Sequence, residues 1–167
     1  MKKYAFTLLS IFFLISCASN EKKLTETSCP ELFISKEHKD YYSADKDNIS
    51  GKMNYIATIN NYKLKCQTSE RDAIFSILDI LFIVTPLESE VTTYDYHYFV
   101  SILDYNNEVL DYQIFSVNGK FPLDENNNLN EAVVTESLDQ YIPLQNNLYK
   151  IVIGFALDEE KYNFINN

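Results

Sequence analysis

The sequence predicts an all-β domain with the architecture of an antiparallel β-sandwich, and three observations carry that prediction. Short segments rich in β-branched and aromatic residues follow one another from Cys29 onward. Breaks rich in asparagine, or marked by proline, separate these segments. No long helical pattern lies between them. Short strands without long intervening helices are typical of a β-sandwich.

The first predicted strands are residues 53–59 (MNYIATI) and 62–66 (YKLKC), which we expect to form a hairpin because Asn60 and Asn61 interrupt the apolar alternation. Residues 74–84 (IFSILDILFIV) are the longest apolar run after the N-terminal segment. The length of this run also suits a buried helix. Its β-branched residues and the Thr-Pro pair that follows favour a central strand.

The clearest hairpin pairs residues 96–103 (YHYFVSIL) with residues 109–117 (VLDYQIFSV) across a turn at 104–107. Asparagine tolerates the positive φ that tight turns need, and it stands where glycine is scarce. Residues 133–142 and 148–157 supply two further strands, and the final DEEKYNFINN is expected to be a short helix or a surface tail. About seven strands of this kind predict an immunoglobulin- or fibronectin-like sandwich.

The N-terminus has the pattern of an export signal and is set apart from the fold. Lys2 and Lys3 precede an apolar run of 12 residues, Tyr4 to Ile15, which is too short to span a bilayer of about 30 Å. The run closes in Leu14-Ile15-Ser16-Cys17, which resembles the lipobox of bacterial lipoproteins. That resemblance implies a thioether-linked diacylglycerol on Cys17 and cleavage before it. The alternative is an ordinary cleaved signal in which Cys17 is only an apolar residue.

This interpretation divides the chain into a signal peptide at residues 1–16, a lipidated flexible tether at 17–28 and the sandwich domain at 29–167. Ala18 and Ser19 follow the cysteine, so the aspartate that retains enterobacterial lipoproteins at the inner membrane is absent. We therefore expect the periplasmic face of the outer membrane. Two or more acyl chains would hold the protein stably on that surface.

Charge and composition exclude one class of partner. Loss of Lys2 and Lys3 with the signal lowers the net charge from −10 to −12, and Arg71 is the single arginine. Binding to nucleic acid needs clustered Lys and Arg to displace counterions, so we expect no nucleic-acid partner.

Two cysteines remain after Cys17 is assigned to lipid. In an oxidising compartment Cys29 and Cys66 are predicted to form a disulfide. In the chain-entropy model, a disulfide that closes a loop of this length stabilises the fold by about 4 kcal/mol. The alternative is two free buried thiols.

Catalytic and metal-binding motifs are missing from the sequence. His38 lies in a polar segment, and His97 lies at the start of a tyrosine-rich strand. His97 with the nearby Asp95 and a serine is the best hydrolase candidate, but a solvated strand residue is the simpler interpretation. There is no HExxH or paired CxxC motif, and the acidic stretches 45–48 and 124–128 lack the glycine and glutamate of a calcium loop. We expect no enzyme activity, no metal and no cofactor.

Tyrosine is the one compositional excess. Packing within the sheets is its first explanation, and a stacking surface for glycans or a protein partner is the second. The tyrosines in or beside predicted strands are Tyr41, Tyr42, Tyr94, Tyr96, Tyr98, Tyr105, Tyr112 and Tyr141.

Taken in order, several segments resemble a family of small uncharacterised lipoproteins of alphaproteobacteria. The matching segments are the box at Cys17, Cys29-Pro30, Tyr55-Ile56-Ala57 before Cys66, Tyr98-Phe99-Val100 with Asp104, Glu136, Ile142-Pro143-Leu144, Tyr149 to Phe155, and Tyr162-Asn163. The chain departs from the family in its few glycines and arginines. The resemblance implies a paired Cys29 and Cys66 and an all-β domain, but no substrate or reaction.

The sequence as a whole therefore predicts a membrane-anchored periplasmic lipoprotein that acts as an envelope-associated binding or structural module, with an envelope protein or glycan as partner. The alternatives are a periplasmic hydrolase that uses His97 and Asp95, and a peptidoglycan-binding module that uses exposed tyrosines.

Overall fold

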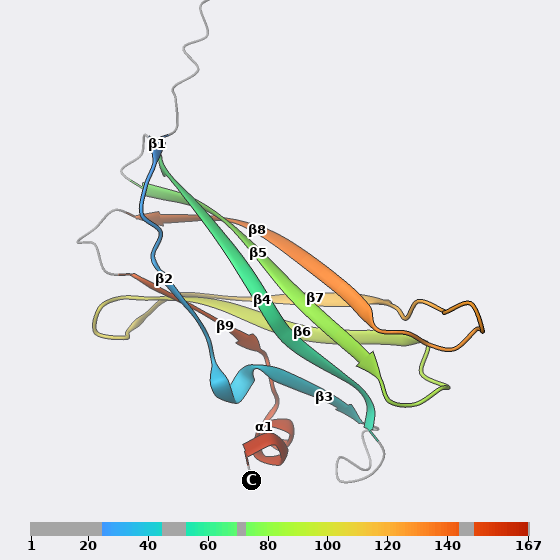
Figure 1. Cartoon of the computed structure of the whole chain (residues 1–167). Coiled ribbons are helices and arrows are strands. Elements are labelled where there is room, and N and C mark those ends of the chain that lie inside the picture. The colour runs from blue at the N-terminus through green and yellow to red at the C-terminus, as the bar shows by residue number, and fades with distance from the viewer. Residues whose placement is uncertain (1–24, 45–52, 70–72, 144–148, 167) are drawn as a thin grey trace, which may run out of the picture.

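The computed structural model describes residues 25–44, 53–69, 73–143 and 149–166 (Figure 1). Cys17 and the acidic stretch 45–48 lie outside the described residues. In the described part the elements are β1 (Thr25–Glu26), β2 (Glu31–Ile34), the 3-10 helix η1 (Lys36–His38), β3 (Asp40–Ala44), β4 (Met53–Ser69), β5 (Ala73–Pro86), β6 (Thr93–Leu103), β7 (Val109–Lys120), β8 (Ala132–Pro143), β9 (Lys150–Phe155) and α1 (Glu159–Asn166).

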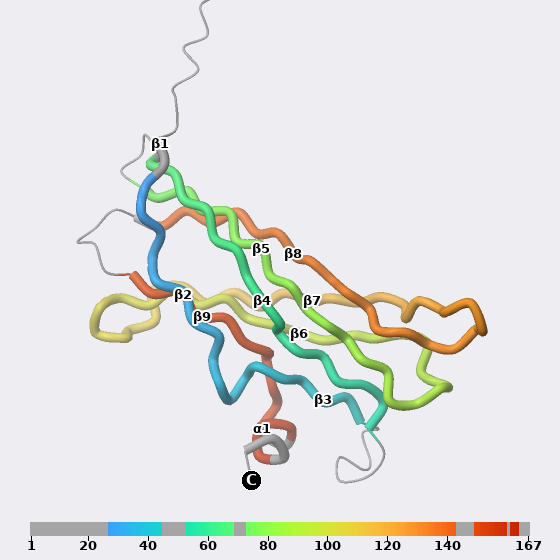
Figure 2. The backbone as a smooth tube through the Cα atoms, in the orientation of Figure 1, coloured from blue at the N-terminus to red at the C-terminus, as the bar shows by residue number. Residues whose placement is uncertain are grey.

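The strands form two sheets that pack face to face, which confirms the predicted β-sandwich (Figures 1 and 2). Sheet A has the order β1-β4-β5-β8, with β3 also paired to β4. Sheet B has the order β2-β9-β6-β7. The described residues hold more strands than the expected number of about seven, because β1, β2 and β3 are too short for an alternating pattern to reveal them.

The order of the last strands differs from that of an immunoglobulin domain. The final strand β9 pairs antiparallel with β6 and parallel with β2, and it does not pair with its predecessor β8. In the constant immunoglobulin domain the last two strands are neighbours in one sheet. Here the neighbouring pair β6 and β7 forms the hairpin of sheet B, and the chain then crosses to β8 in sheet A.

The predicted hairpin at residues 53–66 is wrong, because β4 is one strand of 17 residues. Asn60 and Asn61 lie at a β-bulge, where the pairing with β5 shifts register between Ile59 and Asn61. The bulge changes which residues face the core. Before it the odd-numbered residues face the core, as the fully buried Ile59 does, and after it the even-numbered residues do, as the buried Cys66 shows. An extra residue in one strand bends the strand without ending it.

The predicted central strand is confirmed as β5, which lies between β4 and β8. Its even-numbered residues from Ile74 to Val84 face the core and are buried, while its odd-numbered residues from Phe75 to Ile83 are half-buried. A strand that is paired on both edges and at least partly covered on both faces has a continuous apolar run, which is why length alone also suited a helix.

The predicted hairpin of β6 and β7 is also confirmed, and its turn has a specific chemistry. Asp104 Oδ1 accepts hydrogen bonds of 2.8 Å from the backbone N–H groups of Asn106 and Glu108. Asn107 adopts a positive φ of 64°, the left-handed conformation that asparagine tolerates. The same arrangement recurs at Asp124, where Asn127 has a φ of 62°.

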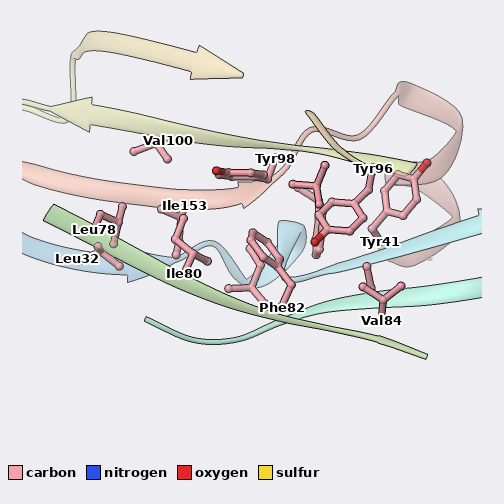
Figure 3. Close-up of a cluster of buried hydrophobic side chains, with 14 of the residues drawn as sticks. Leu32, Tyr41, Leu78, Ile80, Phe82, Val84, Tyr96, Tyr98, Val100 and Ile153 are labelled. Carbon is pink, nitrogen blue, oxygen red and sulfur yellow. The ribbon is translucent and has the colours of Figure 1, made fainter. Parts of the chain in front are cut away.

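The core lies between the two sheets and is rich in aromatic rings (Figure 3). Phe82 of β5 faces Tyr96 and Tyr98 of β6, with ring centroids 5.3 and 5.0 Å apart. Phe155 of β9 lies 5.8 Å from the Phe82 ring and closes the cluster. All four side chains are fully buried.

The C-terminal segment forms a short helix, the first of the two structures expected for it. Helix α1 packs beside η1 and β3 through Lys161, whose ammonium group donates a hydrogen bond of 3.0 Å to the Tyr41 hydroxyl. The same ammonium group lies 4.6 Å from the centre of the Tyr41 ring.

Candidate functional site: the outer face of sheet B

The predicted disulfide is present. Cys29 and Cys66 are bonded, with Cα atoms 5.3 Å apart. Cys29 precedes β2 of sheet B and Cys66 lies in β4 of sheet A, so the bond ties the two sheets together where the described chain begins. Just before this bond, β1 pairs with β4, so the folded part begins within the segment predicted as tether.

His97, the predicted catalytic candidate, lies on the outer face of sheet B and is exposed. The register pairs it with Ser116 of β7, and Asp95 lies two residues away on the same face. Among the described residues no hydrogen bond joins the His97 ring to Asp95 or Ser116, and His97 lines neither of the two depressions described below. The imidazole thus has neither a hydroxyl to activate nor a carboxylate that fixes its orientation.

His38, which the sequence placed only in a polar segment, has a structural role that sequence reasoning missed. Its ring Nδ1–H donates a hydrogen bond of 2.9 Å to the carbonyl oxygen of Phe155. The ring lies edge-on to Phe99 and also contacts Tyr162 of α1. A Cβ at Gly154 would lie 2.6 Å from the His38 Cβ, so glycine is needed for η1 to approach β9 this closely.

The tyrosines divide between the two interpretations. Tyr41, Tyr94, Tyr96 and Tyr98 are buried, as sheet packing predicts. Tyr42 is half-buried. The exposed members of the set are Tyr105, Tyr112 and Tyr141, with exposed fractions of 65, 50 and 64%.

The three exposed tyrosines do not share one surface. Tyr112 lies on the outer face of sheet B, opposite Ser101. Tyr141 lies on the outer face of sheet A, where its ring contacts Phe75 at 5.0 Å. Tyr105 lies in the turn between β6 and β7. A single stacking platform for a sugar chain would need at least two of these rings on one face.

The outer face of sheet B nevertheless carries several exposed apolar side chains. The register places Phe33, Val152, Ser101 and Tyr112 in one row across β2, β9, β6 and β7. Adjacent strands lie about 4.8 Å apart, so this row is roughly 14 Å long. Phe33 and Tyr112 are 42 and 50% exposed.

The next row adds a second apolar position. Ile114, 55% exposed, lies opposite Phe99, and the Tyr112 ring stacks on the Phe99 ring with centroids 5.4 Å apart. We call Phe33, Val152, Tyr112 and Ile114 the outer-face patch. The His38 ring of η1 covers the neighbouring part of this face at Phe99, but Phe33, Tyr112 and Ile114 of the patch remain exposed.

Two depressions lie at opposite ends of the sandwich. One, of about 480 Å³, lies beside the disulfide and is lined by residues that include Cys29, Tyr105 and Lys150. The other, of about 400 Å³, lies between the residues that follow β5 and the turn around Asn127 and Asn128. Neither lies on the outer-face patch.

Acidic side chains in the described part do not assemble a metal site. No three His, Cys, Asp or Glu side chains among the described residues are placed to hold a metal ion. The Asp124 carboxylate is occupied by its own turn: it accepts hydrogen bonds from the backbone and side chain of Asn128, which lower the pKa of the Asp124 carboxyl. The interpretation of this stretch as a loop agrees with that geometry.

Within the described ranges, no helix is long and apolar enough to cross a membrane. A scan against protein-family models, a search of curated proteins and a search of solved structures found no match to the chain. The resemblance to alphaproteobacterial lipoproteins therefore stays a prediction.

Proposed function

We propose that this protein is a bacterial lipoprotein, anchored through Cys17 to the periplasmic face of the outer membrane, which binds an envelope partner through the outer-face patch. The observation that carries the binding role is the set of exposed apolar side chains on the outer face of sheet B, Phe33, Tyr112 and Ile114. Soluble proteins rarely leave large contiguous apolar surface open, and such surface usually marks a site of interaction.

The anchoring role draws support from the N-terminal sequence and from the disulfide. The sequence supplies the short apolar run that ends in Leu14-Ile15-Ser16-Cys17. The bond between Cys29 and Cys66 suits an oxidising compartment, because cytosolic thiols are kept reduced.

The patch favours a protein surface as its partner. Its exposed members are one aromatic ring from each edge strand and one isoleucine, Phe33, Tyr112 and Ile114, and none of them is charged. Aromatic side chains without charge are typical of the centre of a protein interface.

The alternatives receive less support. A hydrolase would need the His97 ring to contact a carboxylate and a hydroxyl, and its exposed position gives it neither contact. A peptidoglycan-binding module would need exposed tyrosines on one face, and Tyr112 and Tyr141 lie on opposite sheets.

Anchoring is tested by cell fractionation of a Cys17→Ala variant. We expect this variant to leave the membrane fraction. A Cys29→Ser/Cys66→Ser variant, which retains Cys17, should stay with the membrane, so it controls for loss of any cysteine. Membrane association of Cys17→Ala equal to that of the wild type would refute the anchor.

Binding is tested by a photo-crosslinking amino acid placed at Tyr112 in intact cells. Val133, 69% exposed on the outer face of sheet A, is the matched control position. We expect a discrete cross-linked species from position 112 that is absent from position 133. Equal cross-linking from both positions would mean that the patch is not the binding surface.

A further inference from the structure

The described chain begins at one end of the sandwich, and this end carries exposed apolar side chains. The described chain begins at β1, whose Thr25 and Glu26 pair with Thr68 and Gln67 near the end of β4. We call this the tether end. The opposite end is formed by residues 87–92 and 121–131, which follow β5 and β7 (Figures 1 and 2).

The turn between β6 and β7 lies at the tether end. Tyr105 of this turn lines the same depression as Cys29 and Pro30. The Lys150 ammonium group, at the start of β9, donates a hydrogen bond of 2.9 Å to the Asn107 side-chain oxygen in the turn. The turn is therefore held beside Cys29 and Pro30, which follow β1.

This turn ends in apolar side chains that the rest of the domain leaves open. Tyr105, Val109 and Leu110, which we call the hairpin tip, are 65, 61 and 55% exposed. The Asp104 carboxylate is engaged by its own turn, where it accepts hydrogen bonds from the backbone N–H groups of Asn106 and Glu108. Large apolar side chains of the turn and of the start of β7 are therefore open to solvent.

The length of the chain before β1 limits how far the tether end can lie from a lipid on Cys17. Seven residues, 18–24, lie between Cys17 and Thr25, and the eight Cα–Cα steps that join the two residues span at most roughly 29 Å when fully extended. The lipid thus confines the tether end to the vicinity of the bilayer surface.

We propose that the hairpin tip rests in the interfacial region of the bilayer, as a second contact beside the lipid on Cys17. This inference rests on the proposed anchor. Tyrosine favours the boundary between headgroups and acyl chains, because its ring is apolar and its hydroxyl is polar. Val109 and Leu110, consecutive residues of β7, add aliphatic side chains on the two faces of the hairpin.

The contact is apolar and not electrostatic. The exposed carboxylates of Glu108 and Asp111 flank the tip, so anionic headgroups would repel it. A zwitterionic surface is the occupant that suits the tip.

Docking of this kind fixes orientation. The lipid alone lets the domain tumble within reach of its tether, whereas a second contact holds the sheets at a set angle to the membrane. The outer-face patch, which continues from the same hairpin through Tyr112, would then be presented to partners close to the bilayer.

The chain has no tryptophan, so one introduced tryptophan reports its own surroundings. The test uses the full lipidated chain, purified from membranes and reconstituted into phosphatidylcholine vesicles with and without bromine on the acyl chains near the glycerol. Tyr105→Trp places the probe at the tip. Leu123→Trp is the matched control, because Leu123 lies at the opposite end and is 59% exposed.

We expect brominated lipid to quench the probe at position 105 several-fold more than the probe at position 123, and the emission of the probe at position 105 to shift to the blue on reconstitution. Retention of the disulfide, seen as a mobility shift on reduction, checks the fold of both variants. Replacing part of the phosphatidylcholine with anionic lipid should not increase the quenching at position 105.

Failure of the inference and failure of the anchor give different results. If the chain floats with the vesicles and brominated lipid quenches neither probe, or both equally, the anchor stands and the tip contact is refuted. If the probe at position 105 is shielded from aqueous iodide but not quenched by brominated lipid, a protein segment or a second copy covers the tip, and the inference is again refuted. If the chain does not float, the anchor fails and the tip contact fails with it.

Discussion

The tyrosines of β6 and those of the adjoining turn and edge strand show how one residue type takes two roles in this domain. Tyr94, Tyr96 and Tyr98 alternate along β6 and are buried in the core between the sheets. Tyr105 in the turn and Tyr112 in β7 are 65 and 50% exposed. The face of the strand on which a tyrosine lies, together with coverage of that face by the second sheet, therefore decides what the tyrosine does here.

The hydroxyl groups extend the contrast. Among the described residues, the buried hydroxyls of Tyr96 and Tyr98 have no hydrogen-bond partner. Tyr55, also buried, donates to the carbonyl oxygen of Asp95 and accepts from its N–H at 2.9 Å. The core therefore contains phenols with and without partners.

Of the changes considered, alkaline pH should have the largest effect on the free energy of unfolding, because it ionises the buried phenols. Burial raises the pKa of the Tyr96 and Tyr98 phenols well above the ordinary value, and the Glu136 carboxylate of β8 adds to the shift. The folded state favours the neutral phenols. Their full contribution to the free energy of unfolding is therefore present below about pH 10, the ordinary pKa of a phenol in the unfolded chain. Between the unfolded and the folded pKa, each phenol lowers the free energy of unfolding by up to about 1.4 kcal/mol per pH unit.

Ultraviolet titration should therefore show these phenols ionising together with loss of the near-ultraviolet circular dichroism. A Tyr96→Phe/Tyr98→Phe variant should unfold at higher pH than the wild type. Ionisation of every tyrosine without unfolding would contradict the assignment.

Truncation of one core ring should have the next largest effect. Tyr96→Ala removes a fully buried side chain that contacts Phe82 and Phe155, and we expect it to lower the free energy of unfolding by about 3–5 kcal/mol. Tyr105→Ala in the turn should change it by about 0.5 kcal/mol or less. Urea unfolding measures both, and equal losses would show that Tyr96 is not a core residue.

A methyl group at Gly119 of β7 should disturb the packing of Tyr94 on the neighbouring strand β6. Gly119 of β7 pairs with Tyr94, and a Cβ there would overlap the Tyr94 ring. That ring packs against Tyr96 and Phe121, so it has little room to move. We expect Gly119→Ala to lower the free energy of unfolding by about 1–3 kcal/mol.

Asn118→Ala, at the exposed neighbouring position, is the control for Gly119→Ala and should be close to neutral. Thermal unfolding compares the two variants. Equal melting temperatures would show that Tyr94 does not lie over Gly119.

Removal of single hydroxyls should have the smallest effects, and their signs should differ. Tyr55→Phe loses the hydrogen bonds to Asp95 and should lower the free energy of unfolding by about 1–2 kcal/mol. Tyr98→Phe removes a hydroxyl that has no partner among the described residues, so stability should stay unchanged or rise. Urea unfolding distinguishes them, and a larger loss for Tyr98→Phe would reveal a partner for that hydroxyl.

Patterns within one segment predicted much of the fold. The β6 and β7 hairpin followed from its alternation and from asparagine at the turn, and the structure adds the reason: Asp104 holds the backbone N–H groups of the turn while Asn107 takes the positive φ. Strand β4 was not predictable in the same way. Asn60 and Asn61 suit a turn as well as a bulge, and only pairing with β5 along the whole strand keeps it continuous.

Some features of the candidate site could likewise be predicted from the sequence, and others could not. The disulfide between Cys29 and Cys66 could be predicted, because two cysteines remained for one bond. The outer-face patch could not, because its members come from β2, β9 and β7 and meet only through the register of sheet B. His38 was missed for the same reason, since its hydrogen bond to Phe155 spans 117 positions of the chain.

Residue types and short-range periods were enough to predict the all-β class and the pairing of two cysteines, because neither prediction needed to know which distant parts of the chain pack together. Which apolar residues lie in the core and which remain open was set by packing. Alternation gives every strand two faces, but only the placement of the opposing sheet, and of α1 and η1, excludes water from one of them. That placement leaves the outer-face patch and the hairpin tip exposed, and it is why they are the surfaces to test for binding.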